Sequence, residues 1–88
     1  MPTLAQRVRL QLADENPEAV VYDNYDAATV GICRRFGMPP VVLYDYAKCI
    51  KILVAGGMQE DEAEEYFEFN TMGCWAGDST PCFLDTNV

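Results

Sequence analysis

The chain has 88 residues, of which 50% are apolar, and its 14 acidic and 6 basic side chains, with no histidine, give a formal net charge of −8. This length corresponds to one small domain, residues 1–88, and the apolar content is too high for a disordered chain. The acidic balance argues against direct binding to nucleic acid, because the chain as a whole repels phosphate.

Residues 3–14 are predicted to form the first helix. Thr3 and Gln6 fit the pattern of a capping box, in which each side chain bonds the backbone N–H of the other residue. The apolar residues that follow recur at helical spacing, and Pro17 disfavours helical geometry in the residue before it. The helix is therefore expected to end before Asn16.

Three short segments are predicted to be strands, because they are rich in β-branched and aromatic residues. The second of them also has helical features, but its β-branched residues and the interior Gly31 favour a strand. The segments between them contain Asp, Asn, Gly and Pro, which favour turns. The expected strands are 19–22, 27–35 and 41–44.

Two helices are predicted after the strands. The first opens at Asp45 or Tyr44, and the Asp45 side chain can cap it. It carries an apolar stripe at helical spacing and ends at Gly56-Gly57. The second spans residues 59–70 and begins with an acidic turn, which complements the positive end of the helix dipole. Its expected inner face consists of Ala63, Tyr66, Phe67 and Asn70, and its expected outer face of Glu60, Asp61, Glu64, Glu65 and Glu68.

The predicted order is helix, three strands, helix, helix and an irregular tail, with Trp75 and Phe83 anchoring the tail to the core. Sequential short strands are typical of an antiparallel or mixed sheet with helices packed on one face. The expected fold is therefore a small α+β domain with a short three-stranded sheet and three helices.

All of the net charge lies in the last third of the chain, residues 58–88. Residues 1–57 carry six basic and six acidic side chains, whereas residues 58–88 carry eight acidic and no basic ones. Like charges at i, i+4 destabilise a helix, and carboxylates spaced along a helix can imitate a row of phosphates. The pattern indicates a basic partner, although simple solvation of a charged helix is the alternative interpretation.

Catalytic and cofactor motifs are missing from the sequence. There is no histidine to act as a general base, Gly56-Gly57 lacks the pattern of a phosphate-binding loop, and Ser79 has no base near it in the sequence. The acidic residues do not have the spacing of a calcium-binding loop. We therefore expect no enzymatic activity, no cofactor and no metal site.

Neither a membrane helix nor a signal peptide is predicted. The longest apolar run, residues 52–55, is far shorter than the roughly 20 residues that a bilayer requires. Residues 1–12 carry two arginines and lack the apolar block of a signal peptide. A cytoplasmic location is expected, and each of the four cysteines is expected to be a free thiol in a small apolar niche, Cys49 most clearly. A labile pair between Cys74 and Cys82 is the alternative.

Short motifs occur from Tyr25 to Phe83: Tyr25-Asp26-Ala27-Ala28, Val30-Gly31, Arg35-Phe36-Gly37, Tyr44-Asp45, Cys49-Ile50, Leu53, Gly57-Met58, Glu62-Ala63, Glu65-Tyr66-Phe67, Phe69-Asn70, Trp75, Gly77, Thr80-Pro81 and Phe83. In these motifs the sequence resembles a group of small phage and prophage proteins of no assigned activity. The resemblance covers about residues 20–84 and implies a viral or mobile-element origin, with the host cell as the site of action. Small acidic phage proteins are often inhibitors of host defence, anti-CRISPR proteins among them, and this link is an analogy of class.

Two functional hypotheses follow. In the first, the protein is a non-enzymatic inhibitor or adaptor that acts as a nucleic-acid mimic on a basic, nucleic-acid-processing host protein. In the second, it is a structural or regulatory homodimer whose aromatic residues complete a core across a two-fold axis. The residues expected to bind the partner in the first hypothesis are Glu60, Asp61, Glu64, Glu65 and Glu68, with Phe69 as a hot spot.

Overall fold

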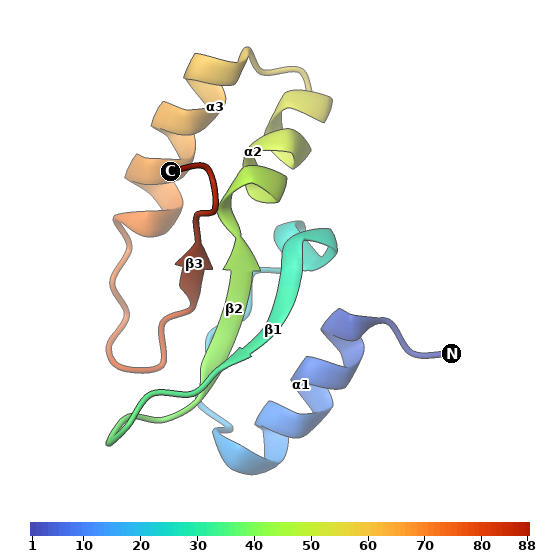
Figure 1. Cartoon of the computed structure of the whole chain (residues 1–88), viewed down its shortest axis with the longest axis vertical. Helices are drawn as coiled ribbons and strands as arrows, with labels where there is room; N and C mark the ends of the chain where they lie inside the picture. The colour runs from blue at the N-terminus through green and yellow to red at the C-terminus, as the bar shows by residue number, and fades with distance from the viewer.

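The computed structural model describes all of residues 1–88. It has the α+β architecture that the sequence predicted, but the order of the regular helices and strands is α-β-β-α-α-β, so the predicted order is wrong. Two further short helices occur, the 3-10 helix η1 and the π-helix η2. In chain order the elements are α1 (Leu4–Glu15), η1 (Asp23–Ala28), β1 (Thr29–Cys33), β2 (Val41–Asp45), α2 (Tyr46–Ala55), α3 (Glu60–Phe67), η2 (Glu68–Met72) and β3 (Cys82–Leu84) (Figure 1).

The sheet is mixed, and β2 is its central strand. β1 pairs with β2 in the antiparallel direction, and β3 pairs with β2 in the parallel direction. In Figure 1, α2 continues from the end of β2, α3 returns beside α2, and α1 lies next to β1 at the other end of the molecule. None of the helices has the length and apolar character needed to cross a bilayer.

The segment at residues 19–22 is not a strand, which corrects the prediction. Its backbone groups are bonded outside the sheet, because Val20 N–H donates to the Ser79 carbonyl at 3.1 Å and Tyr22 N–H donates to the Tyr44 hydroxyl at 2.9 Å. The next predicted strand is also shorter than expected, because its first residues belong to η1. Residues 19–22 therefore form hydrogen bonds to the loop at Ser79 and to the Tyr44 hydroxyl in place of the backbone ladder of a strand.

The third strand is β3, in the segment that was predicted to be an irregular tail. Phe83 of β3 is an anchor, as predicted, because its ring stacks on Tyr44 at 5.9 Å and meets Phe67 edge-on at 5.0 Å between ring centroids. Trp75 is not an anchor, because 68% of its surface is exposed. The core that Phe83 covers consists of Val8, Leu12, Tyr25, Ala28, Val42, Tyr44, Cys49, Ile50, Ala63 and Phe67.

The helix ends are largely as predicted. Thr3 and Gln6 form the expected capping box, and the Asp45 side chain caps α2 by accepting from Lys48 N–H at 3.1 Å. α3, however, ends at Phe67, and the chain continues as η2, in which Gly73 N–H donates to the carbonyl of the residue five positions earlier at 2.9 Å. The predicted third helix is thus an α-helix followed by a π-helical turn.

Candidate functional site

The five carboxylates predicted to bind a partner are all exposed on α3 or at its end. Two side chains cap the start of the helix: the Glu62 carboxylate accepts from Gln59 N–H at 3.3 Å, and the Asp61 carboxylate accepts from Glu62 N–H at 2.9 Å. Only Ala63 and Phe67 of α3 are buried, so most of the circumference of the helix faces solvent. We call Glu60, Asp61, Glu64, Glu65 and Glu68 the acidic face.

The acidic face is not a single row, because its carboxylates divide between two sides of α3. On one side, three of them line a groove of about 520 Å³ between α2, α3 and the C-terminal tail. Asp85 adds a fourth carboxylate to the groove, and Lys51 is its only cation. The full lining is Tyr46, Ala47, Ile50, Lys51, Glu60, Glu64, Glu68, Asp85 and Asn87.

The negative potential inside this groove affects the pKa of the Tyr46 hydroxyl. Burial is the first cause that raises the pKa of its hydroxyl, and the charges of Glu68, Glu64 and Asp85 raise it further. Its ring also packs edge-on against Phe67, with 5.5 Å between centroids, so the tyrosine is fixed to the core. Glu64, Glu68 and Asp85 are therefore close enough to act together on the Tyr46 hydroxyl.

On the other side of α3, aromatic and acidic residues share a shallow depression of about 290 Å³. Phe69 is 78% exposed and Tyr66 is 44% exposed. The predicted inward position of Tyr66 and Asn70 is wrong, since α3 buries only one narrow face and the chain enters the π-helical turn at Glu68. The depression is lined by Glu62, Glu65, Tyr66, Phe69 and Asn70.

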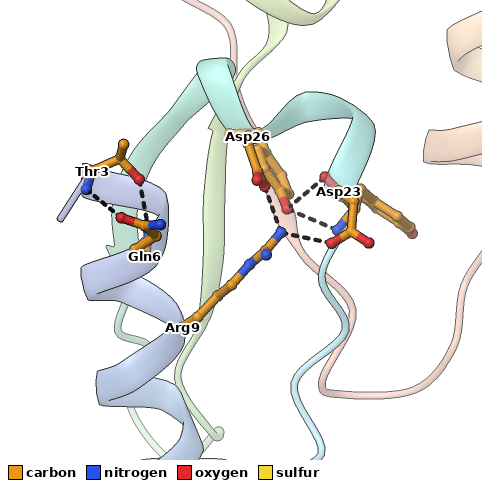
Figure 2. A network of polar contacts seen from close by, with 7 residues as sticks. Thr3, Gln6, Arg9, Asp23 and Asp26 are labelled. Atoms are coloured by element: carbon orange, nitrogen blue, oxygen red, sulfur yellow. Dashed lines mark hydrogen bonds and ion pairs between the residues drawn. The ribbon is translucent and has the colours of Figure 1, made fainter.

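No residue of the acidic face takes part in an ion pair. The three ion pairs of the molecule are Arg9–Asp23, Arg9–Asp26 and Arg34–Glu15, with N···O distances of 2.7, 2.6 and 2.6 Å. Figure 2 shows Arg9 reaching from α1 to both aspartates of η1. Two arginines of residues 1–57 thus form ion pairs with acidic residues of the same segment.

The other basic side chains leave the acidic face equally unpaired. Arg35 donates to the backbone carbonyl of Asp78 at 3.0 Å, and Lys51 lines the groove without forming an ion pair. Because carboxylates on one helix face repel one another and no cation contacts them, their negative potential extends into solvent. The chemistry available here is therefore attraction of cations.

Sequence reasoning found the carboxylates and Phe69, and it missed Tyr46, Glu62, Tyr66 and Asp85. The acidic character of Glu62 was visible, but its position beside Phe69 depends on where α3 turns into η2. Tyr46 lines the groove as the first residue of α2, whereas Asp85 lines it because β3 pairs with β2 and brings the tail next to α2 and α3. No local pattern in the sequence carries that information.

The four cysteines are free thiols. Cys82 has Cys33 rather than Cys74 as its neighbour, and burial followed by the nearby Cys33 raises the pKa of its thiol. Cys74 is exposed and donates to the Asn70 carbonyl at 3.2 Å, so the prediction that it fills an apolar niche is wrong. No group of three or more His, Cys, Asp and Glu side chains is arranged so that it could hold a metal ion.

The site thus consists of an acidic groove, an aromatic depression and, between them, the helix α3, whose acidic face forms no ion pairs. An arrangement of this kind can attract and hold a cationic surface. Its chemistry rests on these residues and their contacts. No protein-family model, no curated protein and no solved structure matches the chain.

Proposed function

We propose that this protein is a non-enzymatic inhibitor or adaptor that binds a basic, nucleic-acid-processing protein through the acidic face of α3. The resemblance to phage proteins makes a bacterial defence protein the preferred partner and the host cytoplasm the place of action. The helix would occupy the groove in which the partner normally holds DNA or RNA. Binding by this means requires no catalytic group, cofactor or metal.

One observation carries this proposal. All five carboxylates of the acidic face are exposed, and none is paired, although the chain contains six basic side chains. A helix used only for solubility gains nothing from leaving like charges at i, i+4 unrelieved, since each such pair costs a few tenths of a kcal/mol. A helix that must attract a basic surface needs that uncompensated charge.

The spacing of the carboxylates also supports mimicry of a phosphate backbone. Glu60, Glu64 and Glu68 follow one another four residues apart. With a rise of about 1.5 Å per residue, they repeat about every 6 Å along the helix axis. Alternate phosphates of one DNA strand repeat at about 7 Å along the duplex axis. A row of Lys or Arg side chains that binds such phosphates is therefore spaced suitably for these three glutamates.

Two charge-matched variants test the proposal. The acidic-face variant carries Glu60→Gln, Glu64→Gln and Glu68→Gln, and the remote-acid variant carries Asp14→Asn, Glu18→Gln and Asp78→Asn. All six positions are exposed and none takes part in an ion pair, so both variants keep the fold and lose equal charge. Each variant and the wild type are immobilised and exposed to a bacterial lysate at low and at high salt.

The wild type and the remote-acid variant are expected to capture nucleic-acid-binding proteins at low salt, and the acidic-face variant is expected to lose them. Capture should fall steeply between about 0.05 and 0.5 M NaCl, because ion pairs at an exposed interface are screened. Equal capture by both variants, or capture that does not depend on salt, contradicts the proposal.

A homodimer is the second candidate function, and the exposure of Tyr66, Phe69 and Trp75 favours it. Two copies that meet through this region would bring their acidic faces together, so salt would strengthen the dimer by screening the repulsion. Docking to a basic partner has the opposite salt dependence. Light scattering at high concentration over a range of salt separates the two: a strict monomer removes the homodimer.

A further inference from the structure

The depression beside Phe69 has a composition that suits one particular ligand. Two aromatic side chains and two carboxylates line the same shallow hollow of about 290 Å³. The aromatic rings are exposed, and the Glu65 carboxylate forms no ion pair. Asn70 is held in place, because its amide donates to the Tyr66 carbonyl at 3.1 Å.

We propose that this depression receives an arginine side chain of the basic partner. The inference rests on the proposed function and adds an anchoring site to its electrostatic attraction. A guanidinium group stacks flat on an aromatic face and donates paired hydrogen bonds to a carboxylate. Phe69 and Tyr66 supply the faces, and Glu65 supplies the acceptor. Glu62 adds charge, although one of its oxygens already accepts from Gln59 N–H at 3.3 Å.

The charge of the depression decides between this occupant and a second copy of the chain. The same two carboxylates would face each other across a two-fold axis, and like charges that are brought together disfavour association. A partner with an apolar side chain would leave both carboxylates without a counter-charge. An arginine can stack on the rings and donate hydrogen bonds to a carboxylate at the same time. Lysine, as a compact and strongly hydrated ammonium group, stacks less well on the rings.

The test uses fluorescently labelled oligoarginine, oligolysine and oligocitrulline of equal length, titrated into the full chain at low salt. Citrulline keeps the shape of arginine and removes its charge. Phe69→Leu keeps an apolar side chain and removes the aromatic ring. Phe36→Leu is the matched control, since Phe36 is fully exposed in the loop after β1 and lies outside the depression.

The wild type and Phe36→Leu are expected to bind oligoarginine about two- to fivefold more tightly than oligolysine, the preference that an exposed cation–π contact provides. Phe69→Leu is expected to bind both peptides equally. Glu62→Gln combined with Glu65→Gln is expected to weaken binding of both peptides, and oligocitrulline is expected not to bind. A wild type without preference for arginine, or a preference that survives Phe69→Leu, overturns the inference.

The same titration separates this inference from the proposed function. If oligolysine binds the wild type and is lost in the acidic-face variant, the proposed function stands even when the arginine preference is absent. If oligolysine does not bind the wild type at low salt, the proposed function fails, and the arginine site fails with it.

Discussion

Glu15 is an acidic residue that pairs with a basic residue of the same segment, residues 1–57. Arg34 donates to it at 2.6 and 2.9 Å, and Gln11 donates at 2.8 Å. These bonds, with Arg34 first, lower the pKa of Glu15 from 4.5 to about 2. No basic side chain pairs with the carboxylates of the acidic face, of which Asp61 alone accepts a hydrogen bond, from Glu62 N–H at 2.9 Å. Glu15 and the carboxylates of α3 therefore differ in whether a basic side chain contacts them.

Arg34→Gln is predicted to return the pKa of Glu15 toward its ordinary value. Because the folded state favours the ionised carboxyl, the stability that the pair contributes is present above about pH 4.5 and is lost as the pH falls toward 2. An NMR titration of the Glu15 side-chain carboxyl in the wild type and the variant measures this directly. An identical midpoint in both proteins would show that Arg34 does not hold the carboxylate.

Cys49 and Cys74 are predicted to differ sharply in reactivity. Burial raises the pKa of Cys49 to about 12, whereas Cys74 is exposed. Since the thiolate is the reactive form, iodoacetamide at about pH 8 should modify Cys74 first and Cys49 only after unfolding. Mass spectrometry of partially alkylated protein gives the order. Rapid labelling of Cys49 in the folded protein would contradict its burial.

At the level of elements, β3 is the piece that closes the core. Besides Tyr44 and Phe67, the Phe83 ring stacks on Tyr22 with 6.4 Å between centroids. The strand has only three residues, so its position depends on this ring as much as on backbone pairing with β2. Through β3, the tail also reaches the groove beside the acidic face.

Phe83→Ala is predicted to lower the free energy of unfolding by about 2–4 kcal/mol, the cost of removing a large ring from a packed cluster. Phe36→Ala removes the same side chain from an exposed loop and should change stability by less than about 0.5 kcal/mol. Urea unfolding followed by circular dichroism compares the two. Equal midpoints for both variants would mean that β3 is not part of the cooperative core.

The elements that the sequence predicted well are those whose signals are local. The capping box of α1 and the Asp45 cap of α2 involve residues three apart, so the sequence alone identified them. The strand at residues 82–84 was missed because its partner, β2, lies about 40 positions earlier, and residues 19–22 look like a strand but bond to Ser79 and Tyr44 instead. The site divides in the same way: the exposure of the carboxylates follows from helical periodicity, whereas the groove and the depression depend on β3 and on the π-helical turn.

For the whole molecule, the uncompensated charge of α3 must also act on stability. Glu68→Gln removes the i, i+4 repulsion Glu64–Glu68, and it also removes a negative charge at the C-terminal end of α3, where the helix dipole disfavours one. Each effect is worth a few tenths of a kcal/mol at low ionic strength. Glu68→Gln should therefore melt at a higher temperature than the wild type at low salt, and the difference should shrink as salt screens the wild type. Thermal unfolding by circular dichroism at several salt concentrations checks the trend; a wild type whose melting temperature is indifferent to salt would contradict it.

The most direct measurement is competition with DNA for a captured partner. Release of a labelled duplex from the purified partner is followed by fluorescence anisotropy as wild type, acidic-face variant or remote-acid variant is added. If α3 takes the place of nucleic acid, the wild type and the remote-acid variant release the duplex at similar concentrations, and the acidic-face variant needs at least about tenfold more, because it has lost three charged contacts. A complex in which the partner holds the duplex and this protein together would contradict the account.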